Sequence, residues 1–151
     1  MLYSTFDNKS FLTPAQQLEK IFAATRVLYK KRDSLAVKLE RACRLAGVQR
    51  KTTVRLGKLE QSFIKEYFKN QIMPLLSPLV INVRHPFPHL VNKALYIAVV
   101  LKEKKTNVLG IIPIPQNLPK LLYLPGRKGK IKYILLEDII LSYAEKIFNY
   151  F

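Results

Sequence analysis

Residues 61–101 read QSFIKEYFKNQIMPLLSPLVINVRHPFPHLVNKALYIAVVL, and this stretch decides the fold of the 151-residue chain. It begins as an aromatic, amphipathic segment, crosses a region rich in proline and ends in a continuous apolar run. Pro74, Pro78, Pro86 and Pro88 each fix their own φ angle and remove a backbone donor. So many rigid corners beside so much apolar surface predict one particular turn under a hydrophobic core.

A helix is expected directly before these prolines, from Lys58 to Met73. Pro74 ends it, because the residue before a proline is disfavoured in the helical region. The apolar side chains of this segment recur with a helical period and form one broad face: Leu59, Phe63, Ile64, Tyr67, Phe68 and Ile72.

A much longer helix is expected nearer the N-terminus, from Pro14 to Ala46. Thr13 suits the N-cap, Gln16 completes a capping box, and Gly47 can end the helix in a left-handed conformation. At 1.5 Å per residue this helix would be about 50 Å long, too long to bury its own apolar stripe, so we expect it to need a partner helix. Alternating spacings of three and four define that stripe: Leu18, Ile21, Thr25, Leu28, Arg32, Leu35, Leu39, Ala42 and Ala46.

After the prolines the pattern changes to that of strands rich in β-branched and aromatic residues. Strands are expected over 94–102, 108–112, 121–124 and 133–136, with turns at 102–107 and 125–130. Glu137 and Asp138 then open a last helix, Ile139 to about Phe148, because acidic side chains favour the N-terminal end of a helix. The expected class is α+β: a long N-terminal helix and a second helix, a mainly antiparallel sheet of about four strands, and a C-terminal helix.

Three segments are expected from composition and pattern. They are a flexible polar leader over 1–12, the long helix with a basic connector over 13–57, and an α+β domain over 58–151. The connector has room for one short extended segment. The last helix has an apolar face with little sequence left to cover it, so we expect the domain to be truncated at its C-terminus.

The sequence shows no secretory or membrane-spanning pattern. Apolar runs such as 94–101 are shorter than a bilayer requires, and the first residues lack the basic-then-apolar order of a signal peptide. Cys43 is the single cysteine, which excludes a disulfide framework and suits the reducing cytoplasm. Its place on the apolar side of the long helix favours a buried structural thiol over a reactive nucleophile.

The formal net charge of +16 predicts attraction to a polyanion, whether nucleic acid, an acidic membrane surface or polyphosphate. A generally lysine-rich composition is the competing explanation. Basic residues cluster on a helix, the connector and two turns: Lys30, Lys31, Arg32, Arg50, Lys51, Arg55, Lys58, Lys102, Lys104, Lys105, Arg127, Lys128, Lys130 and Lys132. If both turns lie on one side of the sheet they form a cationic rim; otherwise they are scattered, solvated lysines. The candidate polyanion contacts are Arg84, Lys102, Lys104, Lys105, Arg127, Lys128 and Lys130.

No residue is predicted to be catalytic, to bind a cofactor or to hold a metal. Gly126 and Gly129 indicate a hairpin tip rather than a glycine-rich phosphate loop. His85 and His89 are four residues apart, but Pro86 and Pro88 preclude the helix that this spacing needs for metal binding. We expect His85 to be structural, with its ring bonded to the backbone of a tight turn. Ion pairs on solvated helix faces are expected for the acidic residues Asp33, Glu40, Glu60 and Glu66.

The proline-rich stretch resembles bacterial polyphosphate kinase, the large ATP–polyphosphate phosphotransferase. That family carries P-x-L-T-P-L and D-x-x-H-P-F-P after an aromatic helix, and this chain has PLLSPL at 74–79 and NVRHPFP at 82–88. Ser77 stands for the family's Thr, and Asn82 for its Asp, which removes a charge from any salt bridge or cap there. The structural signature residues are Pro74, Pro78, His85, Pro86, Phe87 and Pro88. The likeness continues at 12–18, 112–115, 118–120 and 133–140.

The resemblance implies a fragment: the end of the N-terminal helical domain and most of the head, or middle, domain. In the family an N-L-D-E-F segment upstream helps to bind ATP. The phosphorylated histidine and the magnesium site lie in two C-terminal domains, so neither His85 nor His89 inherits that role. The parent implied by the resemblance is a transferase of polyphosphate biosynthesis, an ATP-binding phosphoprotein that forms homo-oligomers. It would be cytoplasmic, with association of the intact enzyme with a membrane as the alternative.

Alone, this segment would be inactive and bind no cofactor. It would support dimerisation of the intact enzyme, contact the remaining domains of the same enzyme and help to guide polyphosphate. One alternative is a small basic nucleic-acid-binding protein, although the chain lacks an RNA-recognition aromatic signature or a compact helix-turn-helix pattern. Another is a purely structural dimerisation module whose charge is incidental.

Overall fold

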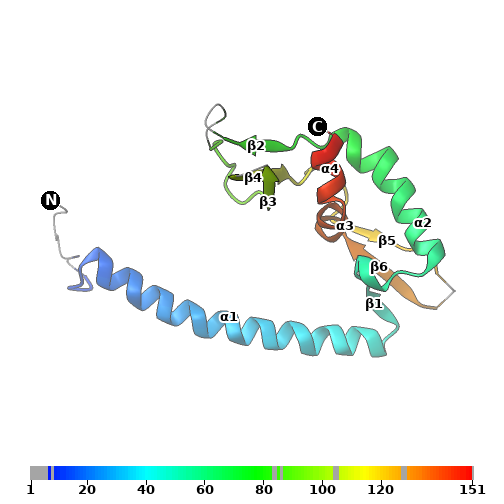
Figure 1. Ribbon diagram of the computed structural model, residues 1–151. Coiled ribbons are helices and arrows are strands. Elements are labelled where there is room, and N and C mark those ends of the chain that lie inside the picture. The colour runs from blue at the N-terminus through cyan, green and yellow to red at the C-terminus, as the bar shows by residue number, and fades with distance from the viewer. Residues whose placement is uncertain are drawn as a thin grey trace. The chain divides into compact units, whose positions relative to one another are not determined.

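The computed structural model describes residues 7, 9–82, 85, 87–103, 106–126 and 129–150, without the side chains of Glu103, Thr106 and Tyr150. The chain divides into two compact units, Met1–Ala46 and Gly47–Phe151. Its elements follow in the order α1 (Pro14–Leu45), β1 (Val48–Arg50), η1 (Thr53–Arg55), α2 (Lys58–Tyr67), η2 (Phe68–Ile72), η3 (Met73–Leu75), β2 (Leu79–Ile81), β3 (Tyr96–Glu103), β4 (Thr106–Pro113), β5 (Leu121–Tyr123), β6 (Ile131–Leu135), α3 (Leu136–Ser142) and α4 (Ala144–Tyr150) (Figure 1).

The first unit is dominated by the long helix α1, which begins where the capping signals predict. The Gln16 amide N–H donates to the Thr13 hydroxyl oxygen over 3.3 Å, and the Thr13 amide N–H donates to Gln16 Oε1 over 2.9 Å. This reciprocal pair satisfies two donors that the first turn leaves free. The helix ends at Leu45, one residue before the predicted end. Gly47 then takes a φ of +84°, as a left-handed terminator should.

No residue of α1 is buried, so its apolar stripe is exposed along its length. The side chains of Leu18, Leu28 and Leu39 are 52%, 62% and 65% exposed. The partner helix that the stripe was expected to need therefore stays a prediction. The expected burial of Cys43 is wrong, because this thiol is only partly covered.

The segment before α1 was predicted to be a flexible leader, and residues 1–6 and 8 of it lie outside the described residues. Among the hydrogen bonds that hold its described end are two made by side chains. The Ser10 amide N–H donates to the Asp7 carboxylate over 2.8 Å, and Gln17 Nε2 in α1 donates to the Ser10 hydroxyl oxygen over 3.0 Å. These bonds tie the last leader residues to the first turns of the helix.

The second unit confirms the α+β class and divides its strands between two sheets. Sheet A has the order β1–β6–β5, with β1 parallel to β6 and β5 antiparallel to it. Sheet B has the order β2–β4–β3, and both of its pairings are antiparallel. The four predicted strands are present as β3 to β6. The prediction of one sheet of about four strands is corrected by β1 and β2, three-residue strands too short to show an alternation.

The connector 48–57, which the sequence groups with the long helix, contributes to the second unit instead. Its strand β1 pairs with β6 in the register Val48↔Ile131, and the Lys51 amide N–H donates to the Tyr133 carbonyl over 2.7 Å. A parallel partner so distant in the chain leaves no local mark on the sequence. The compact unit accordingly begins at Gly47, and the domain expected over 58–151 stays a prediction.

The second helix changes its winding as it approaches Pro74. Regular α2 ends at Tyr67, and η2 continues it as a wider π turn in which the Met73 amide N–H donates to the Phe68 carbonyl. A 3-10 turn, η3, then contains Pro74. Because proline has no N–H, the regular helical ladder cannot pass through it, and the mixed turns re-pair the backbone around that gap. The rotation keeps both Phe68 and Ile72 buried.

The hydrophobic core of the second unit joins the second helix to both sheets and to the C-terminal helices. The last helix was predicted as one segment but is broken at Tyr143 into α3 and α4. The Ser142 hydroxyl donates to the Ile139 carbonyl over 2.7 Å and so competes for an acceptor of the helical ladder. The break lets the Tyr143 ring stack on Phe68 with 4.0 Å between ring centroids. The fully buried large side chains are Ile64, Ile72, Ile112, Ile134, Ile139, Ile140 and Ile147.

Candidate functional site

The proline-rich corner is closed by Asn82 and His85. Their backbones exchange hydrogen bonds over 3.0 and 3.2 Å, and the His85 amide N–H also donates to Asn82 Oδ1 over 2.9 Å. The ring nitrogen Nδ1 of His85 lies 3.3 Å from the same oxygen. The ring of His85 faces the Asn82 side chain rather than the backbone group that was expected, and its structural role stays a prediction. An amide carbonyl oxygen accepts hydrogen bonds as a carboxylate oxygen does. Asn82 therefore still accepts from the His85 amide N–H, although it lacks the charge of the Asp that the family carries there.

Three residues of the signature, Pro78, His85 and Pro88, line a hollow of about 500 Å³ beside β2. Phe87 is 60% exposed, and Val83, Arg84 and Pro86 lie outside the described residues. His89 is exposed. Among the residues that the structure describes, no group of three or more His, Cys, Asp or Glu side chains could hold a metal ion. The hollow is lined by Pro78, Leu79, Val80, Ile81, Asn82, His85 and Pro88.

Glu60 corrects the expectation that the acidic residues lie on solvated helix faces. Its side chain is 8% exposed, Oε1 accepts from Lys132 Nζ over 2.7 Å, and Oε2 accepts from the Gly57 amide N–H over 2.9 Å. The hydrogen bond from Lys132 lowers the pKa of Glu60 below its ordinary value of 4.5, against the opposing effect of burial, and the Gly57 bond adds to the lowering. This pair ties the start of α2 to the start of β6.

A second ion pair ties the connector to the C-terminal helices. Arg50 in β1 donates to Asp138 Oδ2 over 2.9 Å, and Asp138 lies in the first turn of α3 with Glu137. The prediction that these acids mark a helix start is confirmed. On α1 the predicted exposed pairing also forms, between Arg32 and Asp33 over 2.7 Å. Arg50 and Lys132, two members of the basic clusters, therefore serve internal contacts.

The candidate polyanion contacts are only partly within the described residues. Lys102 in β3 and Lys130 just before β6 are both exposed. The premise that both basic turns lie on one sheet is wrong, because the first joins β3 to β4 in sheet B and the second joins β5 to β6 in sheet A. Whether the turns form a rim stays a prediction. The remaining candidates, Arg84, Lys104, Lys105, Arg127 and Lys128, lie outside the described residues.

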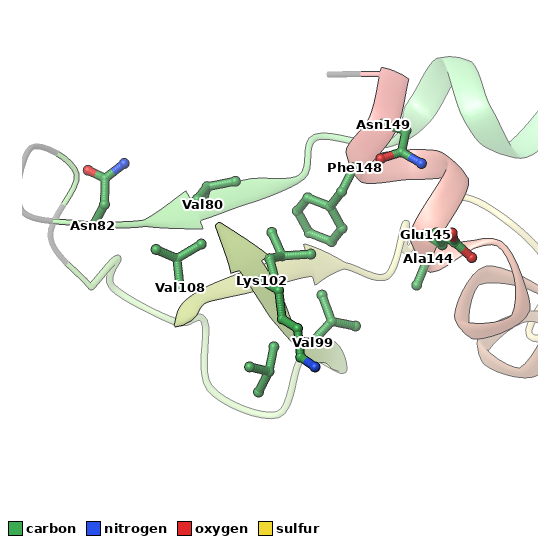
Figure 2. Close-up of a pocket in the computed structure, with 11 residues that line it drawn as sticks. Val80, Asn82, Val99, Lys102, Val108, Ala144, Glu145, Phe148 and Asn149 are labelled. Atoms are coloured by element: carbon green, nitrogen blue, oxygen red, sulfur yellow. The ribbon is translucent and has the colours of Figure 1, made fainter. Parts of the chain in front are cut away.

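A groove of about 680 Å³ runs over sheet B beside α4, where the sequence had indicated no site. Figure 2 shows Phe148 of α4 directed toward the strands. A Cβ atom added to Gly110 in β4 would lie 2.5 Å from Cζ of Phe148, so only glycine allows this approach. In the sequence, the signal for this close approach was Gly110, a glycine inside a strand pattern. The lining residues are Val80, Asn82, Val99, Val100, Leu101, Lys102, Val108, Ala144, Glu145, Phe148 and Asn149.

In the described part of the chain, no helix combines the length and the apolar character needed to cross a membrane. The long helix α1 carries too many charged side chains, and the other helices are short.

Comparison with known proteins matches the second unit to one family. A family model described as the polyphosphate kinase middle domain matches residues 59–151. A polyphosphate kinase of Bacillus cereus is 38% identical over 150 residues, which cover 95% of this chain and 21% of that protein. One of Halalkalibacterium halodurans is 34% identical over 147 residues, covering 95% and 21%.

The fold is also similar to that of a solved structure. The crystal structure of polyphosphate kinase from Porphyromonas gingivalis matches with a TM-score of 0.73 and 23% identity, over 89% of this chain and 22% of that one. The matched unit is thus the middle domain of a kinase. The chain belongs to the polyphosphate kinase family. It spans about a fifth of the length of the curated relatives it matches.

Proposed function

We propose that this chain is the non-catalytic middle-domain portion of a polyphosphate kinase, where it supports assembly and helps to guide polyphosphate. The observation that carries the proposal is the match of residues 59–151 to the middle-domain model, because those residues fall within one compact unit. The parent enzyme would transfer the terminal phosphoryl group of ATP to polyphosphate. ATP, magnesium and the phosphorylated histidine of that reaction would be held by its remaining domains.

The use of charge in the second unit supports a structural role with polyanion guidance. The carboxylates of Glu60 and Asp138 are taken up by internal pairs, whereas Lys102 and Lys130 stay exposed. The whole chain has 26 Lys and Arg residues against 10 Asp and Glu residues, so its cations outnumber the carboxylates that could pair with them. A linear polyanion gains affinity from such cations by releasing its counterions.

Guidance is tested by measuring polyphosphate binding across salt concentrations. We expect the triple variant Arg127→Gln, Lys128→Gln, Lys130→Gln to bind more weakly, with a flatter dependence of affinity on salt, because fewer counterions are released. The matched control is the α1 variant Lys30→Gln, Lys31→Gln, Arg32→Gln, which removes the same charge. Equal losses in the two variants, or no loss in the first, would contradict guidance by the turn.

The same assay separates the nucleic-acid alternative, which the net charge of +16 favours. Tighter binding of an RNA than of polyphosphate at equal charge would support a nucleic-acid-binding protein.

A second assay addresses catalysis. We expect no ATP-dependent polyphosphate synthesis by this chain alone, and measurable turnover would show that the chain is itself catalytic.

A further inference from the structure

Sheet B has a long outer edge, formed by β3. The order β2–β4–β3 places β2 and β3 at the edges of sheet B, and the order β1–β6–β5 places β1 and β5 at the edges of sheet A. Strands β1, β2 and β5 have three residues each, a length that limits pairing with another chain, whereas β3 has eight. No proline or glycine interrupts β3, and its first charged residue is Lys102. Among the described edge strands, β3 therefore lacks the usual protection.

The register of the hairpin shows which backbone groups this edge presents. The Ile114 amide N–H donates to the Leu95 carbonyl over 3.0 Å, so position 95 is bonded toward β4. In an antiparallel pair the bonded positions alternate, and the next residue, Tyr96, lies opposite Pro113, which has no N–H to offer. The N–H and C=O groups of positions 96, 98, 100 and 102 therefore point away from the sheet. No residue that the structure describes forms a hydrogen bond with the outward groups at 98, 100 and 102.

The side chains around this edge are apolar on both faces of the sheet. On one face Ala98 is exposed, and the Val100 side chain is 70% exposed. On the other face Val99 and Leu101 line the groove of about 680 Å³ that Phe148 of α4 also lines (Figure 2). A strand that pairs with β3 would alternate its side chains between the two faces. One row would then cover Val100, and the other would lie at the groove.

A cation at the end of the edge selects the charge of the partner. Lys102 is exposed and forms no ion pair with any residue that the structure describes, including Glu145 of α4, which lines the same groove. A second copy of the chain would bring a further surplus of cations, because the formal net charge is +16. Like charges across an interface disfavour a partner, whereas a carboxylate opposite Lys102 is attracted.

We propose that the outer edge of β3 binds an extended acidic segment of a different protein, which becomes a fourth, antiparallel strand of sheet B. The outward main-chain groups of Ala98 and Val100 supply the hydrogen bonds, and the groove takes alternate side chains of the segment. Antiparallel pairing, the more stable kind per residue, puts the N-terminal end of the segment at Lys102. The segment that fits has an acidic residue there, followed by apolar residues. This edge is separate from the turn at 125–130 that is proposed to guide polyphosphate.

The probe is the capped, fluorescently labelled peptide Glu-Asp-Leu-Val-Leu-Val-Thr, and its binding to the full chain is measured by fluorescence anisotropy. With its aspartate opposite Lys102, its two valines exchange hydrogen bonds with positions 100 and 98, and its two leucines lie on the groove side. A scrambled peptide of the same composition should bind about tenfold more weakly, because its apolar pattern no longer matches the edge. Equal binding of the two peptides would show that net charge alone attracts them, and the proposal would be wrong.

Methylated peptides test the main-chain pairing directly. N-methylation of both valines removes the N–H groups that face β3 and should abolish measurable binding. N-methylation of both leucines is the matched control, because their N–H groups face away from β3, and binding should persist. Equal losses from the two modifications would contradict strand addition.

Variants of the edge locate the peptide on the protein. Val100→Pro removes an outward N–H and no bond to β4, so the circular dichroism spectrum should be kept while binding weakens by about tenfold. Lys102→Glu should also weaken binding, whereas its charge-matched control Lys69→Glu, at an exposed lysine on η2, should bind as the wild type does. Unchanged affinity in both Val100→Pro and Lys102→Glu would refute this site.

Hydrogen exchange supplies the structural readout. With the peptide bound, the amides of Ala98 and Val100 should exchange more slowly, while those of Val99 and Leu101 are protected by β4 with or without it. No added protection at Ala98 and Val100 would refute strand addition.

Two further measurements separate this proposal from its neighbours. If sedimentation shows that the chain without peptide is a dimer, and Val100→Pro makes it a monomer, the edge belongs to a second copy and the proposal is wrong. The triple variant Arg127→Gln, Lys128→Gln, Lys130→Gln should retain peptide binding. Strand addition and polyphosphate guidance can therefore fail independently.

Discussion

The helix α1 is specified by local interactions, whereas the second unit is held together by contacts between distant segments. The features that specify α1 all lie within or next to the helix: a capping box at Thr13, a run of helix-forming residues and a glycine after its end. No residue of α1 is buried. In the second unit the stabilising contacts join distant segments, as in β1 with β6 or Glu60 with Lys132. A helix can therefore be specified by its own sequence before anything packs on it, whereas a small sheet cannot.

The largest expected effect is the removal of a core side chain. Ile139→Ala should destabilise the second unit by about 2–5 kcal/mol, because the residue is fully buried and truncation leaves a cavity. Urea unfolding followed by circular dichroism measures it. Leu28→Ala on α1 is the control, and it should change stability by less than about 0.5 kcal/mol. A large loss from Leu28→Ala would show that the stripe of α1 is covered in solution.

The buried ion pair ranks second. Glu60→Gln should cost about 1–3 kcal/mol, because Lys132 loses its charged partner next to the core. Glu66→Gln is the matched control, six residues along the same helix but exposed, and it should be nearly neutral. Equal values for the two variants would mean that the burial of Glu60 contributes nothing to stability.

The same pair predicts an acid-sensitive stability for the second unit. The folded state lowers the pKa of Glu60, so the unfolded chain binds more protons as the pH falls through 4.5. The stabilisation is complete above that pH and is lost as the pH drops through the lower folded-state value. In urea titrations the loss should be smaller for Glu60→Gln than for the wild type, and parallel pH profiles would contradict this assignment.

The smallest expected effect lies in the cap of α1. Thr13→Ala should cost the helix about 1 kcal/mol, because the amide of Gln16 loses its acceptor. Hydrogen exchange of the first-turn amides should accelerate, while amides of β4 keep their protection. Thr13→Ser, which retains a hydroxyl acceptor, should exchange as the wild type does. Faster exchange in both units would show that α1 and the second unit unfold together.

Helix and strand identities were predictable because their signals act over a few residues. The capping box at Thr13, the acidic start at Glu137 and the hairpin of β3 with β4 are all read from neighbouring positions. The two-sheet arrangement was not predictable in this way. Strand β1 has only three residues, and its parallel partner lies at the other end of the domain.

For His85, the sequence predicted a ring bonded to the backbone, whereas the structure places the ring against the Asn82 side chain. An isolated sequence offered no reason to prefer the side chain of Asn82 over a backbone group. Glu60 and Glu66 also look alike in sequence, both on a helix among lysines. Only the packing of β6 against the start of α2 buries the first of them and leaves the second in water.

The sequence by itself determined the α+β class, the start and end of the long helix, the surplus of cations and the proline signature of the middle domain. Tertiary structure alone decided the split into two sheets, the burial of Glu60 and the outer edge of β3 beside the groove over sheet B. The physical reason is the distance along the chain over which the relevant contacts act. Caps, turns and helix periods depend on contacts within a few residues, whereas strand partners, buried charges and clefts depend on which distant segments the core brings together.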